Sequence, residues 1–208
     1  LVSLNNFMLD IPNIPREDVP LGSSEIDNVV VSKYGKIKTK KSPDHLSITS
    51  DIDTDIATNL AGSRFSVLKG DISRLQRSLI HFMLEVAAKN GYEEYYVPFM
   101  ANKESLRGTG QLPKFEEDLF KASDNLYLIP TAEVPLTNLF RNTIIPQDDL
   151  PKKVTSHTPC FRSEAGSYGK DTKGLIRQHQ FEKIELVQVT NPKTSLDDLN
   201  SLLSNAEE

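Results

Sequence analysis

Residues 158–185 have the sequence TPCFRSEAGSYGKDTKGLIRQHQFEKIE, and this stretch decides the fold. It joins two extended runs, 154–164 and 175–189, through a polar segment with glycines at positions 166, 169 and 174. Extended runs joined in this way predict a β-hairpin with a long tip. We therefore expect an antiparallel strand pair in the fold.

The charged side chains of this hairpin are expected to group on particular faces of its strands. Alternate side chains of a strand share a face, which groups five residues of the second run. These residues are Arg177, His179, Phe181, Lys183 and Glu185. On the first run Arg162 and Glu164 share a side in the same way. Such a surface could neutralise a polyphosphate, stack a base on Phe181 and hold an ammonium group. An exposed strand with cross-strand ion pairs has the same pattern, so spacing alone leaves both interpretations open.

The composition is that of one sizeable globular domain with a small appendage. Of the 208 residues, 38% are hydrophobic and 25% are charged. No apolar run is long enough to cross a bilayer, and the first residues lack the pattern of a signal peptide. A single cysteine, Cys160, fits a reducing compartment, so we expect a cytoplasmic protein or one of an organellar matrix. The net charge of −5 gives no general attraction to nucleic acid, so any RNA contact would be local or supplied by another part of a larger protein.

The rest of the chain mixes helices and strands. The clearest helix is 71–90, where Asp71 can cap the start, Gly91 can end the helix and one face is apolar. That face consists of Ile72, Leu75, Leu79, Phe82, Met83 and Val86. Further elements are expected as helices at 49–60, 131–141 and 196–206, strands at 28–33, 92–97 and 126–129, and a basic strand or loop at 36–41. Strands at such irregular spacing predict an α+β domain built on an antiparallel sheet.

Several familiar kinds of site are not predicted. The GSYGK segment at 166–170 lacks the spacing of a Walker loop, and no G-x-G-x-x-G opens a helix. His157, Cys160 and His179 are too few ligands for a zinc site, and Cys160 is expected to be a small buried side chain. We therefore expect no metal ligands within this chain.

Four segments share a specific resemblance. The hairpin resembles the second signature motif of class II aminoacyl-tRNA synthetases, in the form found in the seryl-tRNA synthetase family. GSRFSVLKGDISRLQRSLIHFMLEVAAKNGYEEYYVPFM, at 62–100, resembles the first motif, a dimer-interface helix followed by a strand. GTGQLPKFEEDLF, at 108–120, and YLIPTAEVPLTNL, at 127–139, resemble segments close to diagnostic of the serine-specific family. The resemblance covers almost the whole chain in order, and it implies an antiparallel sheet flanked by helices.

The resemblance implies a role for each hairpin residue. Arg162 would bind the ATP α-phosphate and the serine carboxylate, acting as the catalytic arginine, and Glu164 would contact the adenine amino group. Arg177 would reach the γ-phosphate of a bent ATP. Phe181 would lie under adenine, and Glu185 would be a carboxylate of the serine pocket.

The resemblance also implies the amino-acid site, the reaction and the partners. Thr131 and Glu133 would hold the ammonium group of serine, while Thr131 could also cap a helix. A serine–tRNA ligase converts serine and ATP into seryl-adenylate and transfers the seryl group to tRNA(Ser), and to tRNA(Sec). Arginines and Mg²⁺ stabilise the charge that builds on the phosphoryl oxygens, and the Mg²⁺ ligands are expected outside this chain. A homodimer is expected through the 71–90 helix region.

The chain departs from the family pattern at both ends. Residues 1–20 are interpreted as the end of a tRNA-binding arm helix and a linker, and residues 21–208 as an incomplete catalytic domain. The third family motif needs a glycine-rich strand and helix, but no glycine follows Gly174. The 208 residues alone are therefore expected to be an inactive fragment of a longer ligase. Two alternatives stay open: a paralogue that activates an amino acid for a carrier protein, and a non-catalytic dimerisation or RNA-binding relative.

Overall fold

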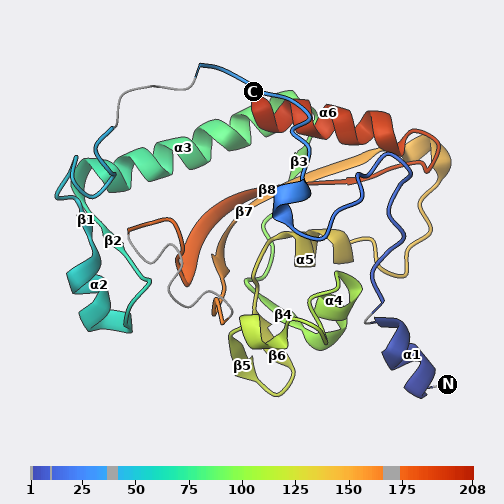
Figure 1. Ribbon diagram of the computed structural model, residues 1–208, viewed down its shortest axis with the longest axis horizontal. Coiled ribbons are helices and arrows are strands. Elements are labelled where there is room, and N and C mark those ends of the chain that lie inside the picture. Colours follow the sequence, from blue (N-terminus) through green and yellow to red (C-terminus); the bar gives the residue numbers. More distant parts are fainter. Residues whose placement is uncertain (1, 10, 37–41, 166–173) are drawn as a thin grey trace. The chain divides into compact units, whose positions relative to one another are not determined.

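The computed structural model describes residues 2–9, 11–36, 42–165 and 174–208 (Figure 1). The chain forms two compact units, Leu1–Ile48 and Thr49–Glu208. The predicted division after residue 20 falls inside the first of them. No helix among the described residues is long and apolar enough to cross a membrane.

The described residues of the first unit, 2–9, 11–36 and 42–48, form little regular structure. Its elements are helix α1 (Val2–Leu9) and a 3₁₀ turn at Glu25–Asp27. The strand predicted at 28–33 is wrong, because these residues are irregular. Val29, Val30 and Val31 are 65%, 66% and 96% exposed, so no packing holds them extended. The basic segment predicted at 36–41 lies, apart from its first residue, outside the described residues.

The described residues of the second unit form three small sheets, five α-helices and two 3₁₀ helices, Glu116–Asp118 and Gln147–Asp149. The sheets have the strand orders β3-β7-β8, β4-β6-β5 and β1-β2. Their strands are β1 (Ile52–Asp53), β2 (Val67–Leu68), β3 (Glu93–Glu94), β4 (Met100–Asn102), β5 (Lys121–Ser123), β6 (Leu126–Leu128), β7 (Lys152–Phe161) and β8 (Gln180–Val189). The helices are α2 (Thr54–Ala61), α3 (Gly70–Lys89), α4 (Lys103–Gly108), α5 (Glu133–Asn138) and α6 (Ser195–Glu207). Every described strand pair except β3·β7 is antiparallel, which confirms the predicted α+β class.

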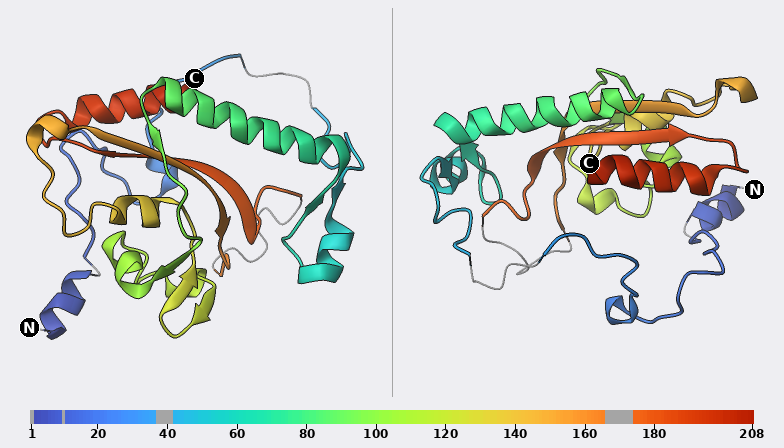
Figure 2. Two further views of the ribbon diagram at one scale, coloured as in Figure 1. Left: turned by 180° about the vertical axis from the view of Figure 1, so that it is seen from behind. Right: turned by 90° about the horizontal axis from the view of Figure 1, so that it is seen from above.

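The β7–β8 hairpin has helices on both faces. Cys160 pairs with Phe181, so even-numbered side chains of β7 and odd-numbered side chains of β8 share one face. On that face α5 packs through Leu136, in a cluster with Val154 and Val187. Helices α3 and α6 lie along the opposite face (Figure 2), where Ile184 faces them. The two faces therefore have separate surroundings.

The hairpin and the long helix differ from the prediction at their ends. β7 ends at Phe161 and β8 begins at Gln180, so the paired part is shorter than the runs 154–164 and 175–189. Glu164 has a φ of 53°, which an extended strand cannot adopt. Asp71 does not cap α3, because the helix begins at Gly70. Asp71 therefore lies in the first turn, where its charge still favours the positive helix end.

Three other predicted elements are shorter than expected. The helix expected at 49–60 begins at Thr54, because Ile52 and Asp53 pair with β2. Only two residues of the strand at 92–97 form β3, although the N–H of Tyr95 still donates to the carbonyl of Thr155 at 2.8 Å. The helix expected at 131–141 covers only 133–138. The predicted strand at 126–129 and the helix at 196–206 are confirmed.

The apolar face of α3 is partly open. Leu75, Leu79, Phe82 and Met83 are 42–56% exposed, whereas Val86 is buried. A hollow of about 410 Å³ lies between this face and β8. Core packing within the second unit therefore explains only part of the apolar stripe.

Candidate active site

A cleft of about 360 Å³ opens beside the ends of β7 and β8. Its lining comes from segments far apart in the sequence, within 111–119, 130–133, 162–164 and 177–183. Leu119 lines the cleft and belongs to a buried apolar cluster with Ile129, the neighbour of the lining residue Pro130. A buried apolar cluster therefore supports the segments that carry the polar groups of the cleft.

Arg162 presents its guanidinium group to this cleft. Its Nε donates a hydrogen bond to the carbonyl of Pro130 at 3.3 Å, and the guanidinium carbon lies 5.2 Å from the centre of the Phe181 ring. This is the distance of a cation–π contact. No described residue forms a hydrogen bond or ion pair with the two Nη atoms. Arg162 can therefore bind a carboxylate or phosphate with both arms of its fork.

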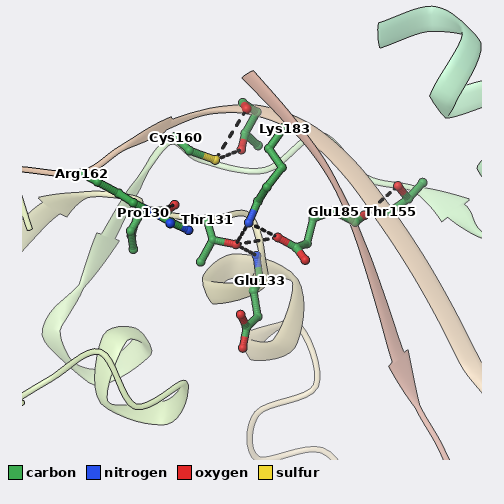
Figure 3. Close-up of polar contacts among 9 residues, drawn as sticks. Pro130, Thr131, Glu133, Thr155, Cys160, Arg162, Lys183 and Glu185 are labelled. Carbon is green, nitrogen blue, oxygen red and sulfur yellow. Dashed lines mark hydrogen bonds and ion pairs between the residues drawn. The ribbon is translucent and has the colours of Figure 1, made fainter. Parts of the chain in front are cut away.

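Thr131 is the centre of a polar cluster (Figure 3). Its hydroxyl donates to Glu185 Oε2 at 2.6 Å and accepts from Lys183 Nζ at 2.8 Å and from the N–H of Glu133 at 3.1 Å. Lys183 Nζ also lies 2.7 Å from Glu185 Oε2. Thr131 is 5% exposed, so its hydroxyl is held away from bulk water. Thr131 is nevertheless not the N-cap of α5, since Ala132 occupies that position and makes no side-chain capping bond. The Thr131 hydroxyl instead accepts from the N–H of the first helical residue.

Glu133 is the carboxylate that stays open to the cleft. It is the first residue of α5 and lines the cleft, and the described residues give its side chain no hydrogen bond or ion pair. Partial burial raises the pKa of Glu133, and the Glu185 carboxylate raises it further, while Lys183 and Arg162 act in the opposite direction. Glu133 therefore suits a cationic group of a ligand, which would restore the missing partner.

Glu164 and Arg177 pair with each other at the outer part of the cleft. Arg177 Nη1 lies 2.8 Å from Glu164 Oε2, and Arg64 donates from Nη1 to the Glu164 carbonyl at 3.4 Å. Both side chains line the cleft. The pair could open to an adenine and a phosphate, the two groups that the resemblance assigns to them.

His179 fixes the backbone of Arg162. Its Nδ1 donates to the Arg162 carbonyl at 2.9 Å, and the Arg162 N–H donates to the His179 carbonyl at 3.0 Å. A carbonyl only accepts, so Nδ1 carries the hydrogen in this tautomer. The ring lies 5.3 Å from the Phe65 ring and 5.7 Å from the Phe120 ring, centre to centre. Arg162 is therefore positioned by a histidine that is itself packed between aromatic rings.

Five of the seven residues suggested by the sequence line this cleft, and the other two, Phe181 and Glu185, contact the lining residues Arg162 and Thr131. The seven residues are Thr131, Glu133, Arg162, Glu164, Arg177, Phe181 and Glu185. The sequence placed Lys183 and His179 on the correct strand face but gave neither of them a role. Their alternation with Phe181 and Glu185 was the available signal.

The candidate zinc ligands do not meet. His157 and Cys160 are three positions apart on β7 and face opposite sides of the sheet. His157 Nε2 lies 2.7 Å from Glu182 Oε2, and Cys160 is fully buried, which raises the pKa of its thiol. Among the described ranges, no three His, Cys, Asp or Glu side chains are grouped as metal ligands.

Known proteins match the chain almost from end to end. A profile of the tRNA synthetase class II core domain (G, H, P, S and T) matches residues 114–208. The chain is 53% identical to the serine–tRNA ligase of Hydrogenobaculum sp. (strain Y04AAS1), over 98% of this chain and 50% of that protein. It is 56% identical to the serine–tRNA ligase of Hydrogenovibrio crunogenus (strain DSM 25203 / XCL-2), over 95% of this chain and 49% of that protein.

Two solved structures resemble the fold over 99% of the chain. One is the crystal structure of seryl-tRNA synthetase from Pyrococcus horikoshii complexed with ATP, with a TM-score of 0.93, 33% identity and 52% of that chain covered. The other is the cytoplasmic serine–tRNA ligase of Naegleria fowleri in complex with AMP, with a TM-score of 0.91, 32% identity and 51% covered. The chain spans about half the length of the curated relatives it matches. Its sequence and fold agree in one assignment: the chain belongs to the seryl-tRNA synthetase family of class II aminoacyl-tRNA synthetases.

Proposed function

We propose that the cleft binds ATP and serine and forms seryl-adenylate, as part of a serine–tRNA ligase that then transfers the seryl group to tRNA(Ser). The observation that carries this proposal is the meeting of two kinds of group in one cleft. Arg162 offers a guanidinium fork on an aromatic ring, and Glu133 offers a carboxylate in the same cleft; among the described residues, neither the Arg162 Nη atoms nor the Glu133 carboxylate has a hydrogen-bond or ion-pair partner. A zwitterionic amino acid and a nucleotide phosphate need these two groups together.

ATP would bind to residues of the β7–β8 hairpin and the loop that joins its strands. Adenine would stack on Phe181 and reach Glu164, and Arg177 would contact the terminal phosphate after its ion pair with Glu164 opens. Arg162 would contact the α-phosphate. These residues lie on the strand face and the loop ends that border the cleft.

Serine would bind at the start of α5 and the middle of β8. The ammonium group would bind Glu133 and Thr131, the carboxylate would face Arg162 and the hydroxyl would face Glu185. A serine carboxylate oxygen then attacks the α-phosphorus, and the bond to the pyrophosphate oxygen breaks. Fixed guanidinium groups stabilise the charge on the phosphoryl oxygens without a protein nucleophile.

We assign no step to Mg²⁺. Mg²⁺ would neutralise charge on the phosphates of ATP. Mg²⁺ usually keeps several waters and binds through one or two carboxylates together with substrate phosphates, and we expect its protein ligands outside this chain. Glu164, one of the acidic residues that line the cleft, is paired with Arg177.

We also propose that the protein is a homodimer through α3. The exposed face of this helix and the hollow of about 410 Å³ beside it form one apolar surface. Apolar surfaces of this kind are typical of interfaces between subunits. A second copy of the chain would remove Leu75, Leu79 and Phe82 from water.

The experiment is direct binding of a stable analogue of seryl-adenylate, seryl sulfamoyl-adenosine, measured by calorimetry on the 208-residue chain. We expect it to bind at least about tenfold more tightly than the alanyl analogue, because a site built around a hydroxyl leaves polar groups unpaired when the hydroxyl is missing. Equal affinity for the two analogues, or no binding of either, would count against the proposal. Arg162→Ala should abolish binding while leaving the circular dichroism spectrum unchanged.

A further inference from the structure

Lys183 makes two short contacts inside the polar cluster. Its Nζ lies 2.7 Å from Glu185 Oε2 and 2.8 Å from Thr131 Oγ1 (Figure 3). The side chains of Lys183 and Glu185 are only 31% and 20% exposed. An ion pair that is this short and this sheltered is stronger than an ordinary surface pair. Lys183 also lines the cleft, so its charge acts on whatever binds there.

Lys183 fixes the direction of the Thr131 hydroxyl. The hydroxyl oxygen accepts from Lys183 Nζ and from the Glu133 N–H, which occupies both of its lone pairs. The hydroxyl hydrogen must then point to Glu185 Oε2, 2.6 Å away. Glu185 Oε2 is consequently engaged twice, by Thr131 and by Lys183. No described residue donates to Oε1 of Glu185, which is the acceptor that remains for a ligand.

The two carboxylates of the cluster therefore differ in character. Glu185 is neutralised by Lys183, whereas the described residues leave Glu133 without a direct partner. A cationic group at Glu185 Oε1 would stand next to the Lys183 ammonium and be repelled. A neutral hydroxyl group would donate to Oε1 without this repulsion. The cluster thus contains one position for a cation and one position for a neutral donor.

We propose that Lys183 is a specificity-determining residue, which makes the Glu185 end of the pocket accept a hydroxyl side chain and reject a cationic one. This inference rests on the function proposed above, in which serine binds with its ammonium at Glu133. It adds a discrimination that size cannot supply, because an amine and a hydroxyl have nearly the same volume. Rejection of this kind uses a repulsive element as well as an attractive one.

The test compares serine with β-aminoalanine, its analogue with an amine in place of the hydroxyl, at a mildly acidic pH where both amines are protonated. Affinities of the 208-residue chain for the two ligands are measured by ligand-observed NMR titration. We expect Lys183→Met to weaken serine binding and to shift the ratio of the two affinities toward β-aminoalanine by about 10- to 100-fold. Lys183→Arg keeps the positive charge and should restore most of the preference for serine. Lys193→Met, at an exposed lysine beyond the end of β8, is the matched control and should leave the ratio unchanged.

The outcomes separate the two proposals. If the unmodified chain binds serine and Lys183→Met leaves the ratio unchanged, the inference about Lys183 is overturned and the proposed function stands. Weaker ATP binding in Lys183→Met with an unchanged ratio would also overturn it, and would assign Lys183 to the phosphates. If the unmodified chain binds neither serine nor the seryl-adenylate analogue, both proposals fail.

Discussion

Replacing Thr131 with valine tests the polar cluster, because valine has a similar shape but no hydroxyl. The substitution removes three hydrogen bonds: one to Glu185, one from Lys183 and one from the N–H of Glu133. Hydrogen bonds to charged groups contribute about 1.5–3 kcal/mol each. Lys183 and Glu185 keep each other at 2.7 Å, so neither charge is left alone. We therefore expect a loss of about 2–3 kcal/mol in the free energy of unfolding, well below the sum of the separate bonds.

The assay is urea unfolding followed by circular dichroism, since the chain contains no tryptophan. For a slope of about 2 kcal/mol per molar urea, the midpoint should fall by about 1–1.5 M. The control is Thr131→Ser, which keeps the hydroxyl and loses one methyl group, at a cost of about 0.8 kcal/mol. If the valine variant were as stable as the serine variant, the hydroxyl would not be the centre of the cluster and the reasoning would be refuted.

Three further predictions concern the ligands and the interface. Because the pKa of Glu133 is raised, its carboxylate becomes protonated at a higher pH than an ordinary glutamate, so serine affinity should fall as the pH falls toward that pKa. Glu133→Gln should bind serine weakly at every pH, and a variant that kept the pH dependence in calorimetry would assign it to another group. Arg162→Lys keeps the charge but loses the fork, and we expect it to weaken the seryl-adenylate analogue about tenfold or more, whereas equal affinity would mean that bidentate contact is unimportant. Leu79→Asp on α3 should shift the chain from dimer to monomer in sedimentation at matched concentrations, and an unmodified chain that is monomeric at high concentration would contradict the interface.

The strand pattern predicted most of the hairpin and the grouping of the site. Alternation correctly placed Phe181, Lys183 and Glu185 on one face, because a strand has a fixed period of two. Arg162 and Arg177 lie beyond the paired strands, where no simple period applies, yet both line the cleft. The roles of these residues toward ATP and serine came from the family resemblance and stay predictions.

Contacts between distant segments could not be predicted from the sequence pattern. The bond between Thr131 and Glu185 joins residues 54 positions apart, and its partner Lys183 has no local signal that distinguishes it from a solvated lysine. The strand predicted at 28–33 failed for a related reason. A run of three valines has a high strand propensity, but only a neighbouring strand or a packed surface can hold it extended.

Because β7 pairs with β8, the site depends on whether an odd or an even number of residues is inserted into or deleted from β8. Ten residues of each strand are paired in continuous register, from Lys152↔Val189 to Phe161↔Gln180. Removing one residue of β8 between Phe181 and Glu185 would leave these two on opposite faces, whereas removing two would keep them together. Insertions and deletions within β8 should therefore be tolerated in pairs or not at all, a constraint that no single substitution imposes.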